Sequence, residues 1–165
     1  MTIGYAFQGY DKENMARALG SSLPISAKHS EMVCNYIRGK SVERAKKMLE
    51  EVIAMEKAVP MTRHNFDRGH KTKIGPGRYP VKTCEEILMI LKSAEKNAQQ
   101  KNIADPVVLH ICAQKAAKPW HYGRKRRRQM KRAHIEIVLA KALKEPVKKV
   151  KRTVKTVKKE EKKQT

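Results

Sequence analysis

A dense set of cations between Asp105 and Leu139 is the feature of this sequence that could do chemistry. Its members are Lys115, Lys118, Arg124, Lys125, Arg126, Arg127, Arg128, Lys131 and Arg132. Guanidinium groups bind phosphate through two-point contacts and stack on bases, so such a set is typical of proteins that hold folded RNA. Because a segment of this kind cannot bury a core, we expect it to be solvated or pressed against a polyanion.

The composition of the whole chain favours the same partner. The formal net charge is +22 over 165 residues, far more than solubility requires. We expect nucleic acid rather than anionic membrane, because no basic amphipathic helix, lipid anchor or apolar run of about eighteen residues is visible. The start of the chain lacks the layout of a signal peptide, so we expect a cytoplasmic protein. We expect no membrane partner and no homo-oligomer.

Groups that could catalyse a reaction do not come together in the sequence. Glu50 and Glu51 are neighbours on a predicted helix, as are Glu85 and Glu86. Neighbouring helical side chains point about 100° apart, which suits solvated faces and not an acid and base pair. The turn around Gly75 lacks the strand, the remaining glycines and the lysine of a phosphate-binding loop. We therefore expect no enzyme.

Cysteines and histidines show no metal-binding pattern. Cys34, Cys84 and Cys112 are odd in number and far apart, and none is in a C-x-x-C pair. We interpret each as a small core hydrophobe and expect neither a disulfide framework nor a zinc site. The six histidines also lack ligand spacing, so no metal and no cofactor is expected.

Two apolar runs bracket the cations and predict a long β-hairpin over about residues 106–139. In the returning run Ile135, Ile137 and Leu139 alternate with more polar residues, which is the period of a strand with one buried face. In the outgoing run the predicted shared face consists of Val107, Leu109, Ile111 and Ala113. The cations between the runs then form the end of the hairpin.

Three amphipathic helices are predicted in the rest of the chain. Ser26 is the expected N-cap of the first helix, which ends before Gly39, and Ser41 is the expected N-cap of the second. Because only Gly39 and Lys40 separate these helices, we expect them to form a tight αα-hairpin. The third helix follows Pro80 and extends to about Lys101.

The remaining segments are predicted to lack helix. Residues up to about Leu23 suggest an extended arm or short strand, and the segment from Leu23 to Ile25 could add an edge strand. Prolines and glycines in residues 58–80 predict an irregular cationic loop in which Phe66 and Tyr79 could stack on bases. We expect an α+β domain over residues 1–143, with three helices packed on a small antiparallel sheet, and a basic disordered tail over residues 144–165.

Several short motifs, in order along the chain, resemble a ribosomal protein family. They are Ile25-Ser-Ala-Lys28, Tyr36-Ile-Arg-Gly-Lys-Ser-Val42 with Ala45, Ser93-Ala-Glu-Lys-Asn-Ala98 and His134-Ile-Glu-Ile-Val138. Together they are similar to the twenty-second protein of the large ribosomal subunit in bacterial numbering. The motifs Gly69-His-Lys71 and Gly75-Pro-Gly-Arg-Tyr-Pro-Val-Lys82 resemble its archaeal and eukaryotic branch. At the hairpin tip only Gly123-Arg124 matches the usual family signature, and the hairpin is a few residues shorter.

The resemblance implies a structural protein that binds large-subunit ribosomal RNA, supports its assembly and lines the polypeptide exit tunnel with its hairpin. Implied partners are the ribosomal RNA, neighbouring large-subunit proteins and the nascent polypeptide. The resemblance implies that the RNA-binding residues of the hairpin are the nine cations named above together with Trp120, His121 and Tyr122. On the body they are Lys28, Arg38, Lys40, Arg78, Tyr79, Lys82 and Asn97.

Two other classes of function fit the sequence less well. A chromatin-like or regulatory DNA-binding protein would suit the lysine-rich tail, but it needs a basic recognition helix, and the first two helices are mixed in charge. An RNA-modifying enzyme needs a cofactor pocket or a catalytic pair, and the sequence indicates neither.

Overall fold

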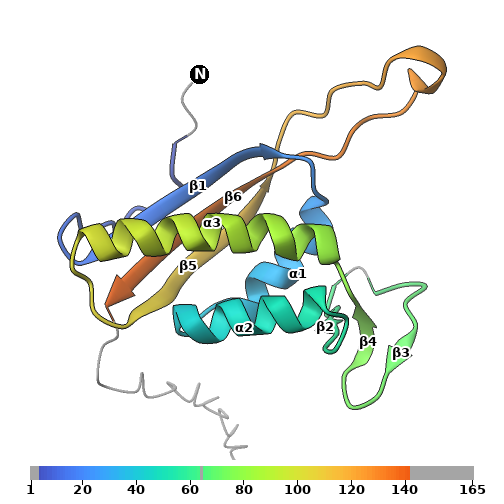
Figure 1. Cartoon of the computed structure of the whole chain (residues 1–165). Helices are drawn as coiled ribbons and strands as arrows, with labels where there is room; N and C mark the ends of the chain where they lie inside the picture. The colour runs from blue at the N-terminus through green and yellow to red at the C-terminus, as the bar shows by residue number, and fades with distance from the viewer. Residues whose placement is uncertain (1–3, 64, 142–165) are drawn as a thin grey trace, which may run out of the picture.

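The computed structural model describes residues 4–63 and 65–141. Within these ranges, three α-helices and a three-stranded antiparallel sheet form the body, which confirms the predicted α+β class (Figure 1). The sheet contains β1 (Met15–Leu23), β5 (Pro106–Lys115) and β6 (Ala133–Lys141), with β6 in the middle. The tail predicted for residues 144–165 lies outside the described residues.

The helices lie close to where the sequence predicts them. α1 (Ala27–Ile37) packs mainly on β5, α3 (Val81–Gln100) packs on β1 and β6, and α2 (Val42–Ile53) packs on α3. Lys46 on α2 also donates a hydrogen bond of 2.7 Å to the carboxylate of Glu95 on α3. Ser26 and Ser41 occupy the N-cap positions, but neither hydroxyl makes a capping hydrogen bond.

The predicted αα-hairpin is wrong. α2 turns away from α1 and packs on α3 instead, because the link between α1 and α2 is bound to the sheet. Gly39 has a φ of 72°, and its amide donates to the carbonyl of Val108, whose own amide donates to the carbonyl of Lys40. Both hydrogen bonds are 2.9 Å long. A glycine suits this left-handed conformation, which redirects the chain after α1.

β6 is buried on both faces. Ile135, Ile137 and Leu139 join the core formed with the helices, as their alternation predicts. Glu136 and Val138 point to the opposite face and are buried as well. The amides of Ala6 and Phe7 donate to the Glu136 carboxylate at 2.8 and 3.1 Å, so the N-terminal arm (residues 4–14) covers this second face.

β5 departs from the predicted alternation. We expected Val107, Leu109, Ile111 and Ala113 to share one face, but Val108 and Ile111 are the buried residues and Leu109 is 45% exposed. The reason is a β-bulge: Val108 pairs with Leu139 and His110 with Val138, which leaves Leu109 as an extra residue. Because of this extra residue, Val107 and Val108 exchange faces of the sheet relative to the prediction, while Ile111 and Ala113 keep the predicted face.

The region after α2 has more regular structure than the sequence predicts. β2 (Val59–Pro60), β4 (Gly75–Arg78) and β3 (His70–Lys71) form a second small antiparallel sheet in that order. A Cβ on Gly77 would lie 3.0 Å from Lys71 Cγ and 3.3 Å from Ala58 Cβ, so the absence of a side chain there allows the close approach. The prolines and glycines of residues 58–80 predict an irregular loop, because they interrupt the sequence pattern by which such short strands would be recognised.

The edge strand also differs from the prediction. It extends over Met15–Leu23 and ends where we expected it to begin. Arg17 on this strand lies between two aromatic rings of the arm, 4.2 Å from the centroid of Tyr5 and 4.4 Å from that of Tyr10. These cation–π contacts, together with the hydrogen bonds to Glu136, fix the arm to the sheet.

The bulge gives a prediction for two residues of one strand. We expect Ile111→Ala to lower the free energy of unfolding by about 2 to 5 kcal/mol, because it leaves a cavity in the core. Leu109→Ala should cost less than about 1 kcal/mol, since nearly half of this residue is exposed and it lies outside the core. Urea unfolding followed by circular dichroism measures both, and equal losses would contradict the bulge.

Candidate nucleic-acid interface

The hairpin extends beyond the sheet as a narrow paired ribbon. We call residues 115–132 the finger, and Figure 1 shows it projecting away from the helices. Its two limbs remain connected: the amide of Ala116 donates to the carbonyl of Arg132 at 3.2 Å, and that of Met130 donates to Pro119 at 2.8 Å. A short 3₁₀ turn at Gly123–Lys125 closes the tip, with Gly123 at a φ of 64°.

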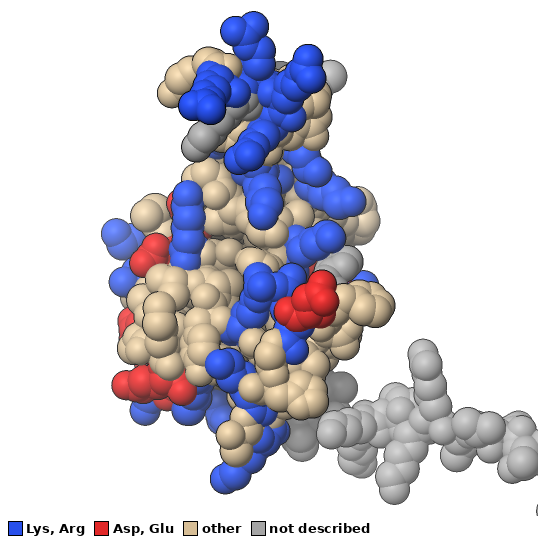
Figure 2. Space-filling model, turned by 90° about the vertical axis from the view of Figure 1, so that its right-hand side faces the viewer, with Lys and Arg blue, Asp and Glu red and all other residues tan. Residues whose placement is uncertain are grey.

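The finger presents cations and aromatic rings to the solvent. No acidic residue occurs between Asp105 and Glu136, so no carboxylate of this segment competes for the cations. Trp120 is 60% exposed and Tyr122 is 88% exposed, while His121 is half-buried. Figure 2 shows the Lys and Arg side chains gathered over the finger and continuing across the face below it. Exposed rings among cations are suited to base stacking and phosphate contact.

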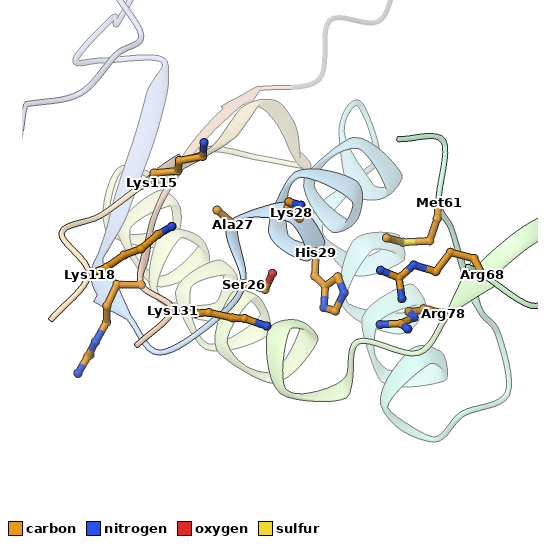
Figure 3. A pocket seen from close by; sticks show the side chains of 11 residues that line it. Ser26, Ala27, Lys28, His29, Met61, Arg68, Arg78, Lys115, Lys118 and Lys131 are labelled. Carbon is orange, nitrogen blue, oxygen red and sulfur yellow. The ribbon is translucent and has the colours of Figure 1, made fainter. Parts of the chain in front are cut away.

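A cleft of about 370 Å³ lies beside the base of the finger (Figure 3). Its walls come from the finger, the start of α1 and the second small sheet with its loop. They are formed by Ser26, Ala27, Lys28, His29, Met61, Arg68, Arg78, Lys115, Lys118, Lys131 and Arg132. Seven of these residues are Lys or Arg and none is acidic, so the cleft has the charge of an anion-binding site.

The start of α1 adds to the positive potential of the cleft. Ser26, Ala27 and Lys28 line it, and the first turn of this helix contains no acidic residue. A helix N-terminus carries a partial positive charge and free amides, which favour an anion. Burial lowers the pKa of His29, and the nearby charges of Arg78 and Lys131 lower it further. His29 therefore favours its neutral form in this cleft.

Five of the predicted body residues are not among those lining the cleft. Arg38 donates to the carbonyl of Ile111 at 2.7 Å, and Asn97 donates to that of Arg17 at 3.0 Å, so both stabilise the body. The Tyr79 ring is half-buried, with Lys71 Nζ 5.4 Å from its centroid. Lys40 is half-buried and Lys82 is exposed on α3. Of the seven body residues, Lys28 and Arg78 line the cleft.

Five residues that line the cleft are not among the predicted RNA-binding residues: Ser26, Ala27, His29, Met61 and Arg68. Arg68 comes from the loop before β3, and His29 comes from the first turn of α1. Arg68 was visible as one of the cations of residues 58–80, but nothing in the sequence shows that this loop faces the finger. Arg132 was predicted, and its guanidinium also donates to the carbonyl of Ser22 at 2.8 Å, which ties the finger to β1.

The two cysteines of the core, Cys34 and Cys84, have unreactive thiols. Burial raises the pKa of both Cys34 and Cys84 to about 12, so neither thiol ionises near neutral pH. This agrees with their interpretation as small core hydrophobes. Cys112 is half-buried on the face of the sheet under the N-terminal arm, and burial raises its pKa also.

Comparison with known proteins identifies the family. The sequence model of ribosomal protein L22p/L17e matches residues 18–140. The chain is 38% identical to the large ribosomal subunit protein uL22 of Methanosphaera stadtmanae, over 84% of this chain and 96% of that protein. It is 35% identical to uL22 of Archaeoglobus fulgidus, over 82% of this chain and 94% of the relative.

A third relative agrees in coverage. The uL22 protein of Methanocaldococcus jannaschii is 39% identical, over 77% of this chain and 88% of its own length. Among the described residues, no helix is long and apolar enough to cross a membrane. The family match over most of the chain and these archaeal relatives confirm the resemblance seen in the motifs, and the chain belongs to the ribosomal protein L22p/L17e family, as an archaeal-type member.

Proposed function

We propose that this chain is a constituent of the large ribosomal subunit that binds ribosomal RNA through its cleft and finger, and that the finger lines the polypeptide exit tunnel. The observation that carries the proposal is the cationic surface that runs from the finger into the cleft, in a chain of this family. The relatives that the chain matches are large ribosomal subunit proteins, so we infer a structural and not an enzymatic role in the ribosomes of the cytoplasm.

RNA fits the cleft better than a regular DNA duplex does. A backbone phosphate held there would meet guanidinium groups of Arg68 and Arg78 on one side and ammonium groups of Lys118 and Lys131 on the other. Such contacts read the shape of the backbone rather than the sequence of bases. Folded RNA can bend a strand into a cleft of this kind, whereas the exposed face of α2 mixes Glu43 and Glu50 with cations and lacks the character of a recognition helix.

The shape of the finger supports its placement in the tunnel wall. It is a paired ribbon without apolar core, so it needs RNA around it to neutralise its charge and hold it in place. Its base is tied to the body by Arg132, while Trp120 and Tyr122 are exposed nearer the tip. A finger held by RNA on its flanks would present its tip to the nascent polypeptide. The body would remain at the subunit surface beside neighbouring ribosomal proteins.

The same contacts would support assembly. Because the finger and the cleft bind different parts of an RNA strand at once, one protein can hold two RNA segments together. The basic tail of residues 144–165 lies outside the described residues, and we propose that it adds further phosphate contacts.

The cleft gives a prediction on salt dependence. We expect Lys118→Ala to weaken binding to archaeal large-subunit ribosomal RNA by roughly three- to tenfold and to reduce the slope of log affinity against log salt by about 0.7 to 0.9. Lys47→Ala removes the same charge from an exposed position on α2 and is the matched control. Filter binding across a salt series measures both. Equal slopes for the two variants would remove the cleft from the interface.

The finger gives a prediction on its surroundings. A photoreactive residue at position 126 should crosslink to large-subunit RNA and to nascent chains in translating ribosomes. The same group at Met89, which is 69% exposed on α3, should not reach the nascent chain. Crosslinks from position 126 to DNA, or to RNAs without large-subunit enrichment, would refute the ribosomal placement.

A further inference from the structure

Three potential metal ligands meet on the face of the sheet that the N-terminal arm covers. His110 and Cys112 are two residues apart on β5, so their side chains share a face, and Glu136 pairs directly with Cys112 across the strands. His110 Nε2, Cys112 Sγ and a carboxylate oxygen of Glu136 all lie within 4.8 Å of one another. This cluster is on the opposite side of the sheet from the helices and does not belong to the RNA-binding cleft.

The three groups converge without satisfying one another. His110 Nε2 lies 4.0 Å from Glu136 Oε1, beyond hydrogen-bond distance, and this buried nitrogen has no hydrogen-bond partner among residues 4–63 and 65–141. Cys112 Sγ lies 3.9 Å from Glu136 Oε2, which is at best a weak contact for a thiol. A buried nitrogen without a partner destabilises a fold unless something else meets it.

The arm supplies the outer contacts that a metal-binding carboxylate needs. The amides of Ala6 and Phe7 each donate to one oxygen of Glu136 and so hold the carboxylate in place. Each oxygen can accept a second contact, and His110 Nε2 is the neighbour of Oε1 while Cys112 Sγ is the neighbour of Oε2. The ring of Phe7 lies 5.2 Å from that of His110, centroid to centroid, and shields the cluster. Ligating carboxylates in metalloproteins are themselves hydrogen-bonded in this manner.

We propose that His110, Cys112 and Glu136 bind a zinc ion on the face of the sheet that the N-terminal arm covers. Ligand atoms around tetrahedral zinc are about 3.2 to 3.8 Å apart, given bond lengths of about 2.0 to 2.3 Å. Small side-chain rotations bring the three groups to that spacing. One imidazole, one thiolate and one carboxylate form the nitrogen, sulfur and oxygen set that zinc accepts, and a water molecule completes the tetrahedron.

The charges balance in this site. On binding, the Cys112 thiol loses its proton to solvent, and the thiolate and the Glu136 carboxylate together neutralise the two positive charges of zinc. His110 contributes a neutral nitrogen. Only 2% of Glu136 is exposed, so without a metal ion its carboxylate is a buried negative charge. The zinc-bound site has no net charge and is therefore the more stable arrangement.

Cobalt provides the test, because Co²⁺ replaces zinc and reports its ligands by colour. The full chain, carrying no histidine tag and freed of metal, is titrated with Co²⁺. We expect a thiolate-to-cobalt charge-transfer band that saturates at one equivalent and disappears when Zn²⁺ is added. Cys112→Ala should abolish the band, and His110→Ala should weaken cobalt binding at least tenfold. Cys84→Ala, which changes a buried cysteine of the helix core, is the matched control and should keep the band.

A second measurement needs no variant. Zn²⁺ should slow alkylation of Cys112 in the native chain, as followed by mass spectrometry of its peptide. If Zn²⁺ leaves this rate unchanged and no band forms, His110 only pairs electrostatically with Glu136, and the site is refuted. A band that survives Cys112→Ala would assign the metal to other residues and also overturn the proposal. Neither result bears on RNA binding by the cleft and finger.

Discussion

Burial of β6 on both faces is the constraint on which the rest of the structure depends. As the central strand it pairs with β1 and with β5, so both strands are aligned by it. Ile135, Ile137 and Leu139 join the core formed with the helices, and on the opposite face Glu136 accepts hydrogen bonds from the N-terminal arm. A strand with two buried faces has only one tolerable register, since a slip by one residue would exchange Ile137 with Glu136. The finger is continuous with this strand, so the packing of β6 in the core sets the direction in which the finger projects.

The apolar core and the cationic surface of the chain are separate in space. The body between the helices and the sheet is apolar and holds few charges, whereas the finger and the cleft concentrate cations without carboxylates. The charge of this cationic surface is therefore not neutralised by carboxylates of the finger or of the cleft. The connection between the two parts is local: Arg132 reaches back to Ser22 on β1, and the cleft is walled by the base of the finger and by the start of α1.

The second face of the sheet has a different character. Glu136, His110 and Cys112 form a polar cluster on this face, and Ala6 and Phe7 of the arm contact it. A carboxylate at this depth needs partners, and the amides of the arm provide two of them. The arm therefore does more than cover apolar surface. Its position depends on a polar group that the central strand presents, and Arg17 fixes it further between Tyr5 and Tyr10.

The sequence by itself determined the three helices, the hairpin, the cationic finger and the family, because these depend on local periodicity, charge density and contiguous motifs. Tertiary structure alone decided the contacts between distant segments. The bulge at Leu109 changed which residues of β5 are buried, and the hydrogen bonds at Gly39 sent α2 onto α3. Arg68 and His29 line the same cleft only because the fold brings a loop next to the start of α1. His110 lies near Glu136 only because β5 pairs with β6. Periodicity reports which face of an element is apolar, but it carries no information on which element that face will meet.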